Sequence, residues 1–262
     1  MPADIQVLPE NRTYALVEGT TILAGAMQNG LPFTHACGGN ARCSTCRILI
    51  LEGCSHLSPR TEAEKLIAGQ VGFDEHIRLA CQTQATGPVK LRRLVIDEDD
   101  YLLTKQNLNE TESDAAAGFA PAGKEEQAAI LFADIRGFTP FSESLPPYDV
   151  IHVLDRYFQT MGRVIERHGG SINNTMGDGL LALFESPVSA VRAANEMLSA
   201  LEQFKPYLAA LYGKTFEIGI GIHFGDIVVG TLGYGMGRRK TAIGDAVNFA
   251  SRIEEMNKTL GT

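Results

Sequence analysis

The cysteines of this sequence are placed so that several of them could bind one metal centre. The 262-residue chain has five cysteines, at positions 37, 43, 46, 54 and 81. An odd, clustered set is typical of metal binding rather than disulfide pairing in a reducing compartment. Cys37, Cys43 and Cys46 follow a C-x5-C-x2-C spacing, and 34 residues separate Cys46 from Cys81. A tight loop with three thiolates and a distant fourth suits the two irons of a 2Fe-2S cluster.

Zinc is the alternative occupant of such a site, because a zinc knuckle also uses four cysteines. The usual zinc spacing repeats C-x2-C twice, and Cys81 has no second cysteine at that distance. The iron–sulfur interpretation is therefore favoured, with Cys54 as a spectator thiol outside the ligand set. Gly38-Gly39 supports it, since glycines let a loop curl so that backbone N–H groups point at cluster sulfurs.

Two aspartates in the second half of the chain are candidates for binding divalent cations. Asp134 follows the apolar run 130–133, which predicts a buried strand, and a glycine-containing loop comes next. Asp178 lies in a Gly-Asp-Gly turn between the expected strands 171–176 and 180–184. Each alone is more often a turn-former. If the strands are neighbours, however, both carboxylates converge on one pocket, as two-metal chemistry requires.

Asn248 and Arg252 are four residues apart on an expected C-terminal helix, so they share one of its faces. An amide and a guanidinium in that arrangement could orient a sugar and neutralise charge on a transferring phosphorus. For an isolated pair, a surface role is the commoner interpretation.

The elements that would position the cysteines are short. Residues 1–96 predict a hairpin about the turn 9–12, a helix capped by Thr20 or Thr21 and ended by Gly30, and a strand over 46–51. A second short helix is expected from Ser58 to Ala68, closed by Gly69. Residues 97–126 form an acidic and then Asn-, Glu-, Ala- and Gly-rich linker that could transmit a signal, with a short helical connector over 101–107.

The region 127–262 predicts a regular succession of strands and helices. A helix opens at Pro146-Pro147 and ends at Gly169-Gly170, and a further one starts at Pro187. A second hairpin is expected from strands over 216–224 and 227–232, which flank Gly225-Asp226, and the last helix follows Gly244.

Composition narrows the classes of function. The chain is 44% hydrophobic and 21% charged, as in soluble globular proteins, and its net charge is −8. That net charge and the lack of a basic run argue against a large electrostatic binding surface for nucleic acid. No secretory signal is visible, and the apolar runs are too short to span a bilayer, so a cytoplasmic protein without membrane insertion is expected.

The N-terminal region resembles the 2Fe-2S ferredoxin family. The resemblance lies in Thr34–Cys46, read as THACGGNARCSTC, together with Leu79-Ala80-Cys81-Gln82, and covers about residues 3–96. It implies a β-grasp fold, a 2Fe-2S cluster bound by four cysteines and an electron donor for that cluster. The five-residue first gap is closer to the adrenodoxin-like branch than to plant-type members. The predicted ligands are Cys37, Cys43, Cys46 and Cys81.

Three ordered motifs beyond the linker resemble the class III adenylate and guanylate cyclases. They are ILFADIRGFT at 130–139, TMGDG at 175–179 and IGDAVNFASR at 243–252. The resemblance spans about residues 126–262 and implies a ferredoxin-like α/β sandwich, giving an α+β protein of two domains. The family adds several strands and a basic phosphate-binding residue beyond the last helix. Because this sequence stops at Thr262, we expect a C-terminally truncated domain or an incomplete site.

The cyclase resemblance also implies roles for individual residues. Asp134, Asp178 and the carbonyl of Ile135 would bind two Mg²⁺ or Mn²⁺ ions, and amides of Gly137, Phe138 and Thr139 would hold the triphosphate. Asn248 and Arg252 would stabilise the transition state as the ribose 3′-oxygen attacks the α-phosphorus. In the family, the metal residues and the Asn/Arg pair of one site come from different chains, which implies a head-to-tail homodimer.

Base choice is expected at Asn174 and Thr241, the positions that read the purine in the family. Neutral Asn and Thr can answer the donor and the acceptor of adenine, whereas guanine would favour a carboxylate. The leading hypothesis is therefore an adenylate cyclase acting on ATP and regulated by the 2Fe-2S module. The alternatives are a guanylate cyclase, and an electron-transfer ferredoxin whose cyclase-like domain is inactive and serves dimerisation.

Overall fold

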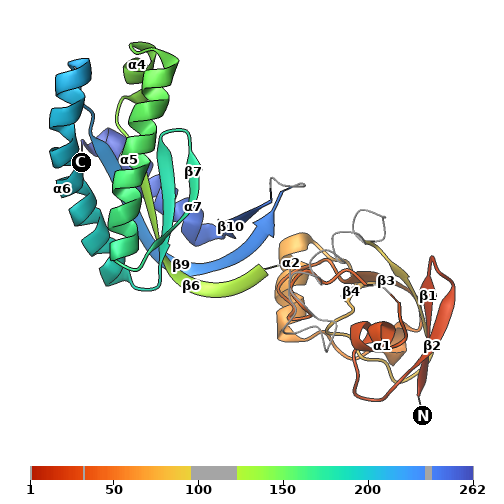
Figure 1. Cartoon of the computed structure of the whole chain (residues 1–262). Helices are drawn as coiled ribbons and strands as arrows, with labels where there is room; N and C mark the ends of the chain where they lie inside the picture. Colours follow the sequence, from red (N-terminus) through yellow and green to blue (C-terminus); the bar gives the residue numbers. More distant parts are fainter. Residues whose placement is uncertain (1, 32, 96–122, 234–237, 262) are drawn as a thin grey trace. The chain divides into compact units, whose positions relative to one another are not determined.

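The computed structural model describes residues 2–31, 33–95, 123–233 and 238–261. The chain divides into two compact units, Met1–Gly123 and Lys124–Thr262 (Figure 1). Most of the linker expected over 97–126, including the helical connector at 101–107, lies outside the described residues. Its last four residues belong to strand β6, which begins at Gly123. Among the described residues, no helix combines the length and the apolar character needed to cross a membrane.

The N-terminal unit is a mixed five-stranded sheet with strand order β2-β1-β5-β3-β4. β1 pairs with β5 in parallel, and the other pairs are antiparallel, including the expected hairpin of β1 and β2. Its elements are β1 (Ala3–Leu8), β2 (Arg12–Leu16), α1 (Ile22–Gln28), β3 (Arg47–Glu52), η1 (Cys54–His56), α2 (Glu62–Val71), β4 (Ile77–Leu79) and β5 (Val89–Arg93).

Local capping explains where the two helices of this unit begin. The Thr21 hydroxyl accepts a hydrogen bond from the backbone N–H of Ala24, so α1 starts where the sequence predicts. The prediction for α2 is wrong at both ends. Thr61 is its N-cap, accepting from the N–H of Glu64, and left-handed Gly72 ends it, whereas Gly69 lies inside the helix.

A buried ion pair fastens α2 to β4. Glu64 is 0% exposed, and its two carboxylate oxygens each lie 2.9 Å from a nitrogen of the Arg78 guanidinium. The same carboxylate accepts the backbone N–H of Leu79 at 2.8 Å, and Arg78 donates to the carbonyl of Ser58. The pair is thus fully hydrogen-bonded, as burial of opposite charges demands. It fixes the strand that leads directly into Cys81.

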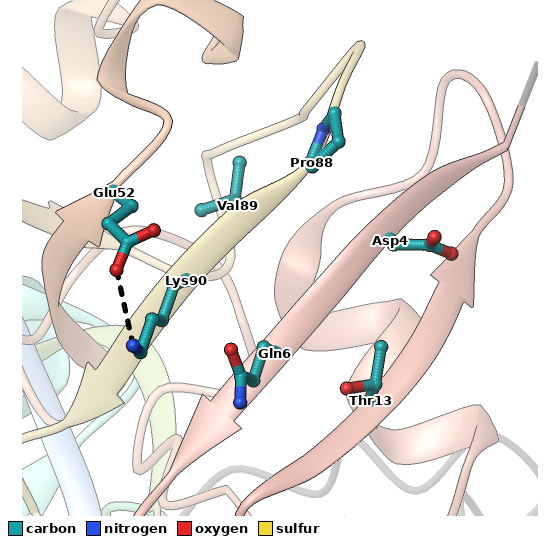
Figure 2. Close-up of a pocket in the computed structure, with 7 residues that line it drawn as sticks. All are labelled: Asp4, Gln6, Thr13, Glu52, Pro88, Val89 and Lys90. Carbon is teal, nitrogen blue, oxygen red and sulfur yellow. Dashed lines mark hydrogen bonds and ion pairs between the residues drawn. The ribbon is translucent and has the colours of Figure 1, made fainter.

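The outer face of this sheet is polar and slightly hollow. Side chains of β1, β2, β3 and β5 surround a cavity of about 240 Å³ (Figure 2). At one side of it, Lys90 and Glu52 form an ion pair of 3.1 Å. The other lining residues are Asp4, Gln6, Thr13, Pro88 and Val89. None of the cysteines lines it, so the hollow is separate from the cysteine-containing loop.

The C-terminal unit is a five-stranded sheet with strand order β10-β9-β6-β8-β7. Its elements are β6 (Gly123–Ile135), α4 (Phe138–Glu143), α5 (Pro147–Arg167), β7 (Ser171–Met176), β8 (Gly179–Phe184), α6 (Pro187–Tyr212), β9 (Ile218–Leu232), β10 (Arg239–Ile243) and α7 (Asp245–Leu260). The prolines and glycines that punctuate the sequence set these bounds. Pro147 and Pro187 stand in the first turns of α5 and α6, and left-handed Gly169 follows α5.

Alternation along β6 builds a layered core. Ala129, Leu131 and Ala133 pack in one cluster with buried residues of α5 and α6, whereas Ala128 and Ile130 pack with Ala246 and Ala250 of α7. Successive strand residues point to opposite faces, so the sheet carries α5 and α6 on one face and α7 on the other. Together with the β-grasp sheet, this confirms the predicted α+β fold.

The hairpin predicted about Gly225-Asp226 is wrong. β9 runs unbroken from Ile218 to Leu232 and pairs instead with β10, antiparallel, with Thr241 opposite Gly230. Gly225 has a packing role: a Cβ atom built there would lie 2.8 Å from the Cβ of Ala246 in α7. Glycine therefore marks a close approach of helix to strand here, not a turn.

Candidate functional site

The four cysteines of the predicted ligand set form two pairs. Hydrogen bonds between side chains join Cys37 to Cys43 and Cys46 to Cys81. Three of these residues lie in the loop between α1 and β3, and Cys81 follows β4. Two pairs are what a cluster with two irons needs, whereas a single tetrahedral zinc needs four thiolates around one point. Among the described residues, no group of three or more His, Cys, Asp or Glu converges on a single metal position.

Backbone N–H groups of the loop are directed at the sulfurs. The amides of Gly39, Asn40 and Arg42 hydrogen-bond to Cys37, and that of Ala41 to Cys81. The contact with Cys43, followed by these amides, lowers the pKa of Cys37 to about 5 despite partial burial. Gly38, Gly39 and Ala41 have left-handed φ angles of 67°, 84° and 53°, which curl the chain into this nest. The residues present therefore fit an anionic cluster.

Cys54 lies outside both pairs. It is exposed, and its sulfur is 3.7 Å from Nδ1 of His76.

The structure brings Asp134 and Asp178 together at one end of the C-terminal sheet. β6 and β8 are antiparallel neighbours with Ala133 opposite Leu180, so the turn before β8 lies beside the end of β6. Burial, and then the charge of Asp134, raise the pKa of Asp178 to about 6, while the N–H of Ile135 lowers it. Two neighbouring carboxylates are the groups from which proteins build divalent-cation sites.

Tyr157 and Lys258 also lie near this pair of carboxylates. The hydroxyl of Tyr157 is buried without a hydrogen-bond partner among the described residues, and burial, followed by the charges of Asp134 and Asp178, raises its pKa. Lys258, near the end of α7, places Nζ 3.0 Å from Oδ2 of Asp134. An ammonium thus balances the carboxylates in this structure, and an incoming divalent cation would compete with it.

The loop after Asp134 is tied to α7 by a second ion pair. Nη1 of Arg136 lies 2.9 Å from Oε1 of Glu254, and both side chains are largely buried. Gly219 of β9 makes room for them, because a Cβ there would overlap the Arg136 guanidinium. Gly137, with φ of 64°, then turns the chain into α4. The first hydrogen bond of α4 runs from the N–H of Phe141 to the carbonyl of Gly137. The N–H groups of Phe138 and Thr139 come before it, at the end of the helix where amides can donate to phosphate oxygens.

Asn248 and Arg252 are exposed on α7 and are not gathered around the two aspartates of their own chain. Lys258, which does reach Asp134, is six residues beyond Arg252 and ten beyond Asn248. At a rise of 1.5 Å per residue, Asn248 is about 15 Å from Lys258 along the helix. Along α7, the Asn/Arg pair therefore lies apart from the point where the helix contacts Asp134.

Asn174 and Thr241 are half-buried, on β7 and β10. These strands are the two edges of the sheet, yet they are joined by a hydrogen bond of 3.2 Å from the N–H of Ala242 to Oδ1 of Asn173. Sequence patterns do not predict Asn173, Lys258 or the Arg136–Glu254 pair. Their roles depend on contacts between residues 69 to 124 positions apart, for which the sequence carries no local pattern.

Residues 120–260 match the family described as the adenylate and guanylate cyclase catalytic domain. The chain belongs to this family. Residues 5–86 match the 2Fe-2S iron–sulfur cluster binding domain, so a ferredoxin domain precedes the cyclase domain. Cyclase domains of this kind use two divalent metal ions, and the ferredoxin domain is of the type that holds a 2Fe-2S cluster.

Relatives of the cyclase domain include an adenylate cyclase of Anabaena cylindrica, 40% identical over 146 residues, which covers 53% of this chain and 29% of the relative. Adenylate cyclase 1 of Rhizobium meliloti is 36% identical over 148 residues, or 54% of this chain and 22% of that protein. The chain thus spans less than a third of the length of these two relatives. The crystal structure of the guanylyl cyclase Cya2 is 39% identical, covers 52% of this chain and 72% of its own, and has a TM-score of 0.49.

Proposed function

We propose that this chain is an adenylate cyclase that converts ATP into 3′,5′-cyclic AMP and pyrophosphate. The observation that carries the proposal is the convergence of Asp134 and Asp178 at the end of β6, within a domain of the cyclase family. Two neighbouring carboxylates repel one another unless a cation lies between them, and a triphosphate substrate brings such cations with it.

Each group has a distinct task in this scheme. Asp134, Asp178 and the carbonyl of Ile135 would hold two Mg²⁺ or Mn²⁺ ions, which when bound supply charge neutralisation and activate the ribose 3′-hydroxyl. The amides of Gly137, Phe138 and Thr139 receive phosphate oxygens at the start of α4.

The Asn/Arg half-site acts on the same phosphorus from the other side. Asn248 orients the ribose, and the Arg252 guanidinium neutralises charge at the α-phosphorus. The ribose 3′-hydroxyl gives its proton to solvent water as its oxygen forms a new bond to that phosphorus. The bond from the phosphorus to the bridging oxygen breaks, and pyrophosphate leaves with the electron pair.

We propose that the active unit is a head-to-tail homodimer with two composite sites. The separation of about 15 Å along α7 between Lys258, at the carboxylates, and Asn248 supports this arrangement. A second copy of the chain, related by a two-fold axis, would bring its Asn248 and Arg252 to the carboxylates of the first. Each copy gives one half-site to each of two equivalent centres.

Adenine is the proposed base because the two purine-reading positions carry neutral side chains. Asn174 offers both a donor and an acceptor, and the Thr241 hydroxyl can do either. The donor groups of guanine would leave these side chains imperfectly matched, since guanine is read best by a carboxylate. A site built for one hydrogen-bond pattern rejects the other base by leaving buried polar groups unpaired.

The assay that tests this proposal compares ATP with GTP in the presence of Mn²⁺ on the full chain. We expect cyclic AMP as the main product, with kcat/KM for ATP at least about tenfold above that for GTP. The products are separated and quantified by chromatography. Predominant cyclic GMP would make the chain a guanylate cyclase, and no cyclic nucleotide from either would leave the domain as a dimerisation unit of an electron carrier.

We further propose that the 2Fe-2S cluster of the ferredoxin domain regulates cyclisation in a cytoplasmic setting, with an electron donor reducing it. The support is the fusion of the two domains in one chain. Anaerobic reduction with dithionite is expected to change cyclase turnover by at least about twofold, in a direction that the assay determines. The variant Cys46→Ser, which lacks a cluster ligand, is the control and should not respond. Unchanged turnover with a demonstrably reduced cluster would overturn the regulatory role.

A further inference from the structure

The two edge strands of the cyclase sheet are joined by one side chain. In the order β10-β9-β6-β8-β7, four strand spacings of about 4.8 Å would separate β10 from β7 by about 19 Å if the sheet were flat. The N–H of Ala242 in β10 nevertheless donates to Oδ1 of Asn173 in β7 at 3.2 Å. The sheet therefore curls until its edges meet, and Asn173 is the residue that bridges them.

A β-bulge directs Asn173 to this bond. On β8, Ala182 is opposite Ile172 and the next residue, Leu181, is opposite Asn174, so Asn173 is an extra residue in β7. Bulges of this kind re-aim a side chain and are common beside active sites. Without the bulge, strict alternation would tie the direction of this side chain to the regular pleat of β7.

The acceptor is needed because the N–H of Ala242 has no ladder partner on that side. Ala242 is opposite Val229 of β9 but turns its N–H outward, to β7. The residue is only 5% exposed, so an unpaired N–H there would lose the water contact that an edge strand normally keeps. The oxygen of Asn173 thus holds β10 at a fixed distance from β7.

We propose that Asn173 is a positioning residue for purine selection. This proposal rests on the proposed function. The bond joins the residues directly adjacent to the candidate base readers: Asn174 follows Asn173, and Thr241 precedes Ala242. This bond therefore helps to set the separation of the two readers. Hydrogen bonds to a base weaken steeply outside about 2.7–3.2 Å, so a shift of about 1 Å between the edges degrades discrimination.

The test uses two variants of similar volume in the full chain. Asn173→Leu removes the acceptor, and Asn173→Asp keeps an oxygen that can accept the N–H of Ala242. The probes are 3′-deoxyATP and 3′-deoxyGTP with Mn²⁺, which lack the attacking hydroxyl and report binding alone. We expect the ratio of their dissociation constants to move about tenfold toward unity in Asn173→Leu and to stay within about twofold of wild type in Asn173→Asp. Mn²⁺ affinity and the far-ultraviolet circular dichroism should not change in either.

The outcomes separate this inference from the enzyme assignment. A wild-type chain that makes cyclic AMP, with unaltered base preference in Asn173→Leu, would overturn the inference and leave the enzyme assignment standing. If the wild-type chain makes no cyclic nucleotide and base preference in binding is lost only in Asn173→Leu, the enzyme assignment would be overturned and the inference about Asn173 would stand. Equal losses in the leucine and aspartate variants, or a wild type without any base preference, would also overturn the positioning role.

Discussion

Replacement of Asp134 by asparagine is expected to lower cyclic nucleotide formation by at least about 10³-fold. The change removes one of the two carboxylates that meet at the end of β6, and a neutral amide is a weak ligand for Mg²⁺ or Mn²⁺. Metal ions contribute several kcal/mol to the stabilisation of a phosphoryl transition state, and each 1.36 kcal/mol is a factor of ten in rate. The measurement is kcat with ATP and saturating Mn²⁺.

A matched control tests whether the loss of a negative charge alone lowers the activity. Asp155→Asn makes the same chemical change at an exposed position on α5 and should keep activity within about twofold of wild type. Asp134→Asn should remain folded, because burial and the charge of Asp134 together raise the pKa of Asp178, and the variant removes that like charge. A folded Asp134→Asn enzyme with a tenth or more of wild-type turnover would contradict the role of Asp134.

Replacement of Glu64 by glutamine is expected to destabilise the ferredoxin domain by about 3–5 kcal/mol. The guanidinium of Arg78 would be left buried without a counter-charge, which is the costly way to break a buried ion pair. Because β4 leads from Arg78 into Cys81, we also expect faster loss of cluster absorbance. The measurement is urea unfolding of the full chain, followed by visible absorbance and by circular dichroism.

Two further variants make this experiment specific. Glu62→Gln removes an exposed carboxylate on the same helix, which pairs with Lys65, and should cost less than about 1 kcal/mol. The double variant Glu64→Leu with Arg78→Met removes both charges and should recover most of the loss. If Glu64→Gln unfolds like Glu62→Gln, the buried pair does not stabilise this domain.

Much of the fold follows from residues with strong local preferences. Pro147 begins α5, Gly169 follows its end, and Thr21 caps α1, each for a reason visible in the sequence alone. The approach of Asp178 to Asp134 follows once β8 lies antiparallel to β6, a pairing that the sequence leaves as a condition and the structure shows. These predictions rest on turn, cap and strand chemistry that acts within a few residues.

The remaining features depend on tertiary contacts. Glycine at position 225 is typical of a turn. In the structure, however, Ala246 of α7 packs against Gly225, and β9 continues through it. β4 and β5 were not predicted, because one has three residues and the other contains three basic ones in five. The bulge at Asn173 is set by pairing with β8, which no pattern within β7 reveals.

Mixing two inactive variants tests whether each catalytic centre combines residues from both chains of a dimer. Asp134→Asn lacks a proposed metal ligand and Arg252→Ala lacks the guanidinium proposed to stabilise the transition state, so each homodimer should be inactive. When equal amounts of the two variants exchange subunits at random, half of the dimers should be heterodimers, each with one intact centre of two. Activity should therefore return to about a quarter of the wild-type value. No recovery on mixing, with both variants folded and dimeric, would contradict the proposal that each centre takes its carboxylates from one chain and Arg252 from the other.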